Sequence, residues 1–474
     1  MRVALINTNR IQPPIAPLGL EYVAEALAAA GHEPQLLDLC WEEDWAAAVA
    51  GFFAAREVGL VGMSLRNTDD CMYPSRASFL PDFVEMVAAV RRASAAPVIV
   101  GGCGFSILPE AVLELCGADA GVWADGEVAM AEVARRLERG DEWQSVAGVV
   151  RPAATGTGWV RNPPHLRPLD QLPPMGRDFV DNRRYFARGG QLGFETRRGC
   201  PQRCAYCADP VAKGRAVRRR PPGAVADELA RLLAQGIDCL HTCDSEFNVP
   251  ATHAAAVCDE LVGRGLGERL RWYAYCAPRP FTRELARRMR RAGCVGINFG
   301  TDHGDPRMLE VLGRTYTPED VRRVTRWCRE EGLAVMLDLL LGAPGETEAS
   351  IRATVELMRE VEPDRVGVAL GVRLYPGTEL MRQLGDGRSG GLVGSADPRD
   401  PLFFIEPAVA ERAPELIAEL VGGDERFFFE CPTPTAAARS YNYNANQPLQ
   451  QALARGYRGA YWDILRRWRE EEGR

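Results

Sequence analysis

Lysine is almost absent from this chain, which has a single one, Lys213, among 57 basic residues. This leaves little room for a Schiff-base lysine or a phosphate-binding P-loop, both of which depend on a lysine amine. Long apolar runs are also missing, since none reaches the about 18 residues that a membrane-spanning helix needs. The net charge of -7 provides no overall positive field to attract nucleic acid. We therefore expect a cytoplasmic protein with no nucleic-acid and no membrane partner.

The length and composition are those of a folded protein with several domains. The chain has 474 residues, of which 46% are hydrophobic and 26% are charged. These proportions are typical of globular proteins and not of disordered or fibrous ones. A chain of this length normally divides into about two to four domains.

Strand-like and helix-like segments alternate over residues 1–150. Short apolar runs predict strands at residues 2–7, 34–39, 58–65, 97–102 and 120–127. Strands separated by helical segments predict a parallel, doubly wound, Rossmann-like sheet, whose ligand site lies beyond the carboxyl ends of the strands. The loops expected at that edge contain six candidate cofactor contacts: Ser64, Asn67, Gly101, Gly102, Gly126 and Glu127.

The remaining chain divides into three further segments. Proline pairs indicate a linker over residues 151–190. Six strand-like runs separated by helical segments follow within residues 191–385 and predict a partial (β/α)6 TIM barrel, since a closed barrel needs eight such units. Aromatic residues are dense in residues 386–474, which we expect to form a small C-terminal α+β or helical cap, placed as a lid over the barrel mouth. The predicted fold class is therefore α/β.

Three of the 14 cysteines lie close together, and no fourth accompanies them. Cys200, Cys204 and Cys207 are spaced CxxxCxxC in a loop that follows the first strand of the predicted barrel. A structural zinc site normally takes four ligands and would need a distant fourth residue. On a [4Fe-4S] cube, three thiolates leave one iron without a protein ligand, and this iron can bind a small molecule. The spacing alone leaves open both a cluster and a zinc-binding or redox-silent loop.

The CxxxCxxC spacing, with Tyr206 directly before the last cysteine, resembles the signature of the radical S-adenosylmethionine (SAM) superfamily. The resemblance implies that Cys200, Cys204 and Cys207 are the catalytic metal ligands of a [4Fe-4S] cluster. It also implies that the amino and carboxylate groups of SAM chelate the open iron, and that an electron from the cluster cleaves the sulfonium bond of SAM. Tyr206 belongs to the cofactor site by this resemblance.

Later segments resemble the SAM-binding strand ends of the same superfamily, in the same order along the chain. By this resemblance Asp244 and Glu246 meet the amino group of SAM, Asp302 meets the ribose, and Gly342 lies near the adenine. One departure is that the usual Glu-Ser pair is replaced by Asp302 and His303. The carboxylate of Asp302 is shorter than that of a glutamate, so the ribose contact is the least secure of these expectations.

A doubly wound domain ahead of such a barrel resembles the cobalamin (B12)-binding class of the superfamily. The resemblance implies cobalamin at the loops named above. The Asp-x-His-x-x-Gly motif that supplies a cobalt ligand in cobalamin mutases is absent, because residues 38–42 are DLCWE. Some members of the class bind cobalamin without a histidine ligand, and others keep the fold without the cofactor. Cobalamin is therefore implied by the fold and not by ligating residues.

The resemblance implies an enzyme that cleaves SAM with electrons from an external donor such as flavodoxin or ferredoxin. With cobalamin, it implies methyl transfer to an unactivated carbon of a small molecule or natural-product intermediate. Without cobalamin, ring formation, rearrangement or transfer of another SAM fragment, such as the aminocarboxypropyl group, stays open. A cobalamin or iron-sulfur sensor or electron-transfer protein is the non-enzyme alternative, but it would not need the SAM-binding segments.

Four other side chains are candidates for the substrate site. His303 is placed near a strand end as a possible acid, base or metal ligand, although a single histidine is more often a hydrogen-bonded structural residue. Tyr273, Tyr275 and Arg373 lie on predicted barrel strands and are candidates for substrate contacts inside the barrel.

Overall fold

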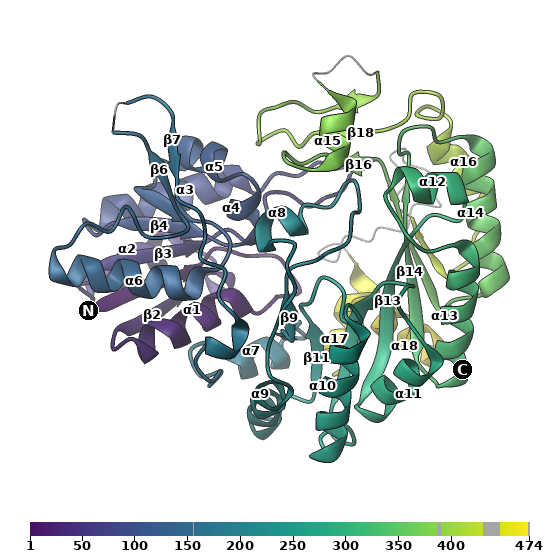
Figure 1. Cartoon of the computed structure of the whole chain (residues 1–474), viewed down its shortest axis with the longest axis horizontal. Coiled ribbons are helices and arrows are strands. Elements are labelled where there is room, and N and C mark those ends of the chain that lie inside the picture. Colours follow the sequence, from purple (N-terminus) through teal and green to yellow (C-terminus); the bar gives the residue numbers. More distant parts are fainter. Residues whose placement is uncertain (155, 386–389, 430–445, 473–474) are drawn as a thin grey trace.

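Two seven-stranded sheets lie side by side in the computed structural model, which describes residues 1–154, 156–385, 390–429 and 446–472 (Figure 1). The first sheet and its helices form the purple and blue part of the chain, and the second sheet runs from teal through green to yellow. Over these described ranges, no helix is both long and apolar enough to cross a bilayer.

The N-terminal sheet consists of β1 (Arg2–Asn7), β2 (Glu33–Asp38), β3 (Leu60–Ser64), β4 (Val98–Gly101), β5 (Ala120–Val122), β6 (Val149–Pro152) and β7 (Trp159–Arg161). Its strand order is β2-β1-β3-β4-β5-β6-β7. The first five strands are parallel, and β6 and β7 extend the β5 edge in antiparallel orientation. The parallel part is the doubly wound sheet that the sequence predicts.

Helices cover both faces of this sheet. They are α1 (Leu18–Ala29), the 3-10 turn η1 (Leu39–Trp41), α2 (Trp45–Ala54), α3 (Leu80–Ala93), α4 (Cys103–Ile107), α5 (Pro109–Cys116) and α6 (Gly126–Arg139). Helices α1 and α6 pack with Val3 and Leu5 on one face, and α2, α3 and α5 pack with Ala4 and Ile6 on the other. Because successive side chains of a strand point to opposite faces, a continuous apolar strand needs cover on both sides.

A short linking region follows, with η2 (Leu169–Gln171) and α7 (Asn182–Ala187). The second sheet then consists of β8 (Gly193–Phe194), β11 (Cys239–Thr242), β12 (Arg271–Cys276), β13 (Cys294–Asp302), β14 (Ala334–Leu341), β15 (Arg365–Leu370) and β19 (Phe427–Phe429). Its order is β19-β15-β14-β13-β12-β11-β8, and all its pairs are parallel. The six expected β/α units are present, and β19 from the C-terminal segment adds a seventh strand.

Helices cover the outer face of the barrel sheet, and smaller elements surround its carboxyl end. The outer helices are α9 (Pro222–Ala234), α10 (Ala251–Gly263), α11 (Arg283–Arg291), α13 (Pro318–Glu330), α14 (Glu348–Val361) and α16 (Ala413–Val421). The smaller elements are β9 (Arg197–Arg198), α8 (Asp209–Lys213), β10 (Arg218–Arg219), α12 (Pro306–Val311), β16 (Val372–Arg373), α15 (Glu379–Leu384), β17 (Leu392–Val393) and β18 (Phe403–Phe404).

The last two helices, α17 (Gln447–Ala454) and α18 (Tyr461–Glu472), pack into the amino end of the barrel. Trp462 lies against Tyr273 and Met336, which are each the third residue of their strands. The expectation that the whole C-terminal segment covers the barrel mouth is therefore wrong for these helices, because the mouth is at the opposite, carboxyl end. From this segment, β17 and β18 lie near the cysteine loop, where Phe404 packs in one cluster with Ala205. The described ranges exclude residues 386–389, 430–445 and 473–474 of this segment.

Buried charges join the two halves of the molecule. Arg177 of the linking region pairs with Glu21 of α1 at 2.5 Å and with Glu228 of α9 at 2.6 Å, and all three side chains are almost fully buried. Arg198, directly before the cysteine loop, pairs with Glu127 at the start of α6 at 2.5 Å. Helix α4 also contacts α8. As a result, the carboxyl edge of the N-terminal sheet faces the cysteine loop.

Candidate active site

The three cysteines lie in the loop between β9 and α8, at the carboxyl end of the barrel strands. Gly199 begins this loop with a φ of +83°, and a side chain there would collide with the carbonyl of Ala216. Glycine adopts this conformation without steric cost. Within the loop the amide of Cys207 donates to the carbonyl of Cys204 at 3.3 Å, and the amide of Ala205 donates to Leu312. The local geometry therefore curls the segment that carries the sulfurs.

Cys200, Cys204 and Cys207 are free thiols. Burial raises the pKa of all three, to about 12 for Cys204. Buried thiols of this kind become thiolates when metal ligation displaces the proton. Over the described part of the chain, no three histidine, cysteine or acidic side chains are grouped closely enough for a single metal ion. A [4Fe-4S] cube binds one thiolate at each iron corner, so three thiolates leave one corner without a protein ligand.

Arg314, in the turn after α12, connects the cysteine loop to the end of β13. Its Nη1 donates to Sγ of Cys204 at 2.9 Å, and its Nη2 donates to the hydroxyl of Tyr206 at 2.7 Å and to Asp302 at 3.0 Å. The Tyr206 hydroxyl donates in turn to Asp302 at 2.9 Å. The structure thus brings together two of the predicted cofactor residues, Tyr206 and Asp302, through an arginine that the sequence analysis missed.

The two acids predicted at the end of β11 have different surroundings. Asp244 accepts hydrogen bonds from the amides of Thr196 and Arg197 at 2.8 and 3.0 Å, so it holds the chain that enters the cysteine loop. Glu246 is buried, and burial raises its pKa to about 7, although Arg314 lies 4.0 Å away and opposes the shift. Of the two, Glu246 has the carboxylate with fewer protein partners and faces the cysteine loop.

Four of the predicted cofactor contacts lie on two adjacent loops at the carboxyl edge of the N-terminal sheet. Ser64 ends β3 and Gly101 ends β4, and these residues are register partners. Gly102 has a φ of +101°, and an added side chain would collide with the carbonyl of Leu65. The backbone alone therefore requires glycine here, whether or not a ligand binds. Asn67 accepts a hydrogen bond from Arg66 at 3.0 Å. The guanidinium of Arg66 is exposed and favours the charged forms of Cys243 and Tyr275 inside the barrel.

The remaining pair of predicted cofactor contacts, Gly126 and Glu127, begins helix α6. The carboxylate of Glu127 accepts hydrogen bonds from Arg198 at 2.5 and 3.1 Å and is 3% exposed. Glu127 therefore pairs with a residue of the barrel half of the molecule. The neighbouring Asp125 also pairs with Arg198, at 3.3 Å.

The interior of the barrel holds a group of polar side chains below the cysteine loop. Tyr275 on β12 exposes 49% of its surface, although its strand lies inside the fold and burial by the surrounding chain raises its pKa to about 12. A side chain that is both water-accessible and enclosed by protein lines an internal space. Asn298 on β13 and Asp338 on β14 lie beside it, joined by a hydrogen bond of 2.6 Å. Tyr275 was a sequence candidate, and Asn298 and Asp338 were not.

The other sequence candidates lie elsewhere. His303 is fully buried between Glu346 and Thr354, to which its ring bonds at 3.1 and 2.9 Å, so it has the structural role that single histidines usually have. Tyr273 donates to Asp463 of α18 at 2.6 Å. Gly342 follows β14 and donates its amide to Glu346.

Arg373 on β16 does not face the barrel interior. It forms an ion pair with Asp69 of the N-terminal half at 2.8 Å and therefore joins the two halves.

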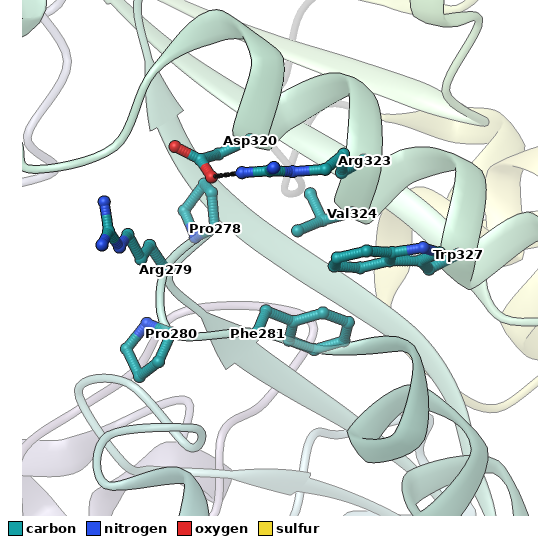
Figure 2. Close-up of a pocket in the computed structure, with 8 residues that line it drawn as sticks. All are labelled: Pro278, Arg279, Pro280, Phe281, Asp320, Arg323, Val324 and Trp327. Carbon is teal, nitrogen blue, oxygen red and sulfur yellow. Dashed lines mark hydrogen bonds and ion pairs between the residues drawn. The ribbon is translucent and has the colours of Figure 1, made fainter.

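A surface hollow of about 310 Å³ lies outside the barrel (Figure 2). Figure 2 shows Phe281 and Trp327 along its lower side, and Asp320 already paired with Arg323 above them. Its lining comes from the loop before α11 and from α13, and contains none of the predicted site residues.

The fold and the cysteine loop define a radical SAM barrel preceded by a B12-binding-type domain. The family model of the radical SAM superfamily matches residues 194–358, and that of the B12 binding domain matches residues 5–134. The chain is 30% identical to a tryptophan 2-C-methyltransferase of Streptomyces laurentii, over 99% of this chain and 96% of that protein.

Solved structures agree with this assignment. The radical SAM methyltransferase TsrM of Kitasatospora setae, with tryptophan substrate and the SAM analog aza-SAM bound, is 31% identical with a TM-score of 0.91, over 100% of this chain and 98% of that chain. The same enzyme with cobalamin and a [4Fe-4S] cluster bound gives a TM-score of 0.87 at 30% identity, over 100% of both chains.

The chain belongs to the cobalamin-dependent radical SAM methyltransferases. This confirms the predicted fold class, the enzyme class and the three cofactors that the resemblance implied, because the family uses a [4Fe-4S] cluster, SAM and cobalamin. It also sets aside the sensor and the cobalamin-free alternatives. The individual residue roles stay predictions.

Proposed function

We propose that this enzyme methylates an aromatic ring carbon of tryptophan or of a closely related indole amino acid. The observation that carries the proposal is full-length similarity, at 30% identity, to a tryptophan 2-C-methyltransferase. A polar, water-accessible space inside the barrel is consistent with a substrate of this size, since Tyr275 and Asp338 line it. The name of this relative specifies a carbon of tryptophan as the methyl acceptor. The sequence analysis predicted only an unactivated carbon of a small molecule or natural-product intermediate.

The cysteine loop is the proposed site of the cluster, with Cys200, Cys204 and Cys207 as its ligands. Their donor set supports this role, because three free thiols, one buried and two partly buried, leave one corner of a cube for SAM. Asp302 and Tyr206 are proposed to bind SAM close to that corner, and Arg314 contacts both of them.

Glu246 and Gly342 complete the proposed SAM site. The cases for Asp244 and Asp302 are weaker. The carboxylate of Asp244 already accepts three hydrogen bonds from the chain before the loop, and that of Asp302 is already bound by Arg314 and Tyr206.

Cobalamin is proposed to lie between the loops of residues 64–67 and 101–104 and the cysteine loop. These loops are at the carboxyl edge of a doubly wound sheet, where ligands of such sheets bind. Gly101 leaves room there, since an added side chain would meet only the carbonyl of Val122, at 3.4 Å. Glu127 is proposed to act by docking the domain, through Arg198, and not by touching the cofactor.

The overall transfer forms a bond between the methyl carbon and the ring carbon, breaks the ring carbon–hydrogen bond, and releases a proton and S-adenosylhomocysteine. When bound, the cluster and cobalamin supply the methyl-carrying and electron-transfer chemistry. The chain's own residues orient the reactants and exclude water, since α17 and α18 close the amino end of the barrel. We also propose a cytoplasmic location and an external donor of the flavodoxin or ferredoxin class.

The test is an anaerobic assay of protein reconstituted with iron, sulfide and cobalamin. With L-tryptophan, reductant and SAM labelled in its methyl group, mass spectrometry should detect labelled methyltryptophan. A variant with all three loop cysteines replaced by alanine should lack the cluster absorbance and form no product. Cys328→Ala, which removes a buried thiol of α13 far from the loop, is the control and should keep both. Absence of any methylated indole from the wild-type reaction would reject the proposed substrate.

A further inference from the structure

Strand β14 places one acid inside the barrel. Its residues Val335, Leu337 and Leu339 are at most 2% exposed and pack with the outer helices. Because side chains alternate along a strand, Met336, Asp338 and Leu340 face the other way, into the barrel. Met336 accordingly packs with Tyr273 and the C-terminal helices. Asp338 therefore lies between this apolar amino end and the carboxyl end that carries the cysteine loop.

Asp338 has no cationic partner among the described residues. Its single hydrogen-bond donor is the Asn298 side chain, and the titratable groups that face it are Tyr275 of β12 and Asp302 of β13. On the β15 side it meets Gly367, where an added Cβ would lie 2.5 Å from Oδ1 of Asp338. Burial, with repulsion from Asp302, raises the pKa of Asp338 to about 7.

Several other acids of the barrel are paired with an arginine, whereas Asp338 is not. Asp302 is bound by Arg314, and Glu195 is bound by Arg198 at 2.8 Å. At the amino end, Asp463 is bound by Arg466 at 2.7 Å. A carboxylate enclosed by protein without a cation is costly, and a cationic ligand would supply the missing charge.

A second acceptor lies beside this carboxylate. Asn298 is 6% exposed, its Nδ2 donates to Asp338, and its Oδ1 has no hydrogen-bond partner within the described structure. The ring of Tyr275, the register partner of Asn298 on the neighbouring strand, is the third wall of the space. A carboxylate, an amide oxygen and an aromatic ring are the groups that bind an ammonium ion, which has three donors and a positive charge.

We propose that Asp338 and Asn298 bind the ammonium group of the substrate amino acid, with Tyr275 beside it. The assignment rests on the proposed function, which makes the substrate an indole amino acid, and adds which of its groups the barrel recognises. The site selects substrates that carry a free, protonated amine. Two unsatisfied acceptors favour an ammonium ligand over a role for Asp338 as a base, because a base needs one acceptor only.

Equilibrium dialysis of the reconstituted holoenzyme against three labelled probes tests the site. The probes are L-tryptophan, tryptamine, which keeps the amine and lacks the carboxylate, and 3-(indol-3-yl)propionate, which keeps the carboxylate and lacks the amine. The affinity of the wild type for the propionate should be at least about 10-fold lower than for tryptophan, since a charged hydrogen-bonded pair is lost. Asp338→Asn should weaken tryptophan and tryptamine by a similar factor and leave the propionate unchanged.

Two further variants keep the test decisive. Gly367→Ala adds a methyl group against Oδ1 of Asp338 without changing any charge, and should also weaken the two amines. Glu360→Gln makes the same acid-to-amide change on the surface, where Glu360 pairs with Arg322, and should change none of the three affinities.

Each outcome decides the proposal. Unchanged binding of tryptophan by Asp338→Asn would overturn the ammonium site while leaving the methyltransferase assignment intact. A fall in kcat at unchanged affinity would also overturn it and would make Asp338 a base. If the wild-type holoenzyme neither binds nor methylates tryptophan, the proposed substrate fails, and the ammonium assignment fails with it.

Discussion

The guanidinium of Arg314 donates from Nη1 to Sγ of Cys204 across 2.9 Å, which places a positive charge against one of the three sulfurs of the cysteine loop. Asp302 holds the same guanidinium in an ion pair. Hydrogen bonds to the sulfurs and the charge near a cluster set its reduction potential. Arg314 is therefore in a position to tune the cluster that we propose the three cysteines to hold.

Replacing Arg314 by glutamine should lower the midpoint potential of the reconstituted cluster, on the order of tens of millivolts. The reduced cluster carries more negative charge than the oxidised cluster. Removal of a charged hydrogen bond worth about 1.5–3 kcal/mol therefore destabilises the reduced state more. A redox titration followed by electron paramagnetic resonance measures the change. Arg314→Lys keeps the charge and should give a smaller shift. Equal potentials for the wild type and Arg314→Gln would contradict the tuning role.

The parts that the sequence predicted correctly depend on local patterns. Apolar runs and intervening helical periodicity predicted the five parallel strands of the N-terminal sheet and the first six barrel strands to within a few residues, because alternation of strand and helix is a short-range signal. Strands β6 and β7 were not predicted, and β7 lies within the residues expected to form a linker. The position of the cysteine loop followed from the same pattern, since it comes directly after the first barrel strand. The departure from the usual Glu-Ser pair was also visible, and the structure accounts for it by pairing Asp302 with Arg314 and burying His303.

The parts that it did not predict depend on contacts between distant segments. Strand β19 joins β15 across more than fifty residues of intervening chain, and no local pattern specifies that pairing. Asp338 lies in an apolar run that correctly predicted a strand. An acid in the middle of such a run was itself a signal of a functional residue. Its lack of a cation becomes visible only when β13 and β15 are placed beside it, because Asn298 and Gly367 decide what it meets.

Removing Arg177 should separate the two halves of the molecule. Its guanidinium is fully buried between Glu21 and Glu228, so Arg177→Met would leave Glu21 without its cation and Glu228 with Arg220 alone, at a cost of about 3–5 kcal/mol. Urea unfolding measures the loss of stability, and limited proteolysis should show faster cleavage within residues 151–190. Arg183→Met, at an exposed position one turn away, is the control and should behave like the wild type. Equal stability of the two variants would show that the buried pairs contribute nothing net.

The ionisation of Asp338 should make the substrate-free protein less stable at higher pH. The folded protein raises the pKa of this carboxyl from 3.8 to about 7, so the unfolded chain loses the proton first as pH rises. The destabilisation therefore grows between about pH 4 and pH 7 and is complete above pH 7. Asp338→Asn should raise the melting temperature clearly at pH 8 and much less at pH 5. Glu360→Gln has no buried charge to remove and should show no such gain.

Shortening Trp462 should weaken the barrel without disturbing the cysteine loop. Its indole is 5% exposed and packs edge-on against Tyr273, with ring centroids 6.0 Å apart, at the amino end of the strands. Trp462→Ala leaves a cavity there and should cost about 3–5 kcal/mol of unfolding free energy. Because the loop is at the other end, the cluster absorbance of the reconstituted variant should match the wild type at low temperature. Tyr273→Phe keeps the ring, loses the hydrogen bond to Asp463 and should cost less. A variant at Trp462 that keeps full stability would mean that the C-terminal helices do not support the barrel.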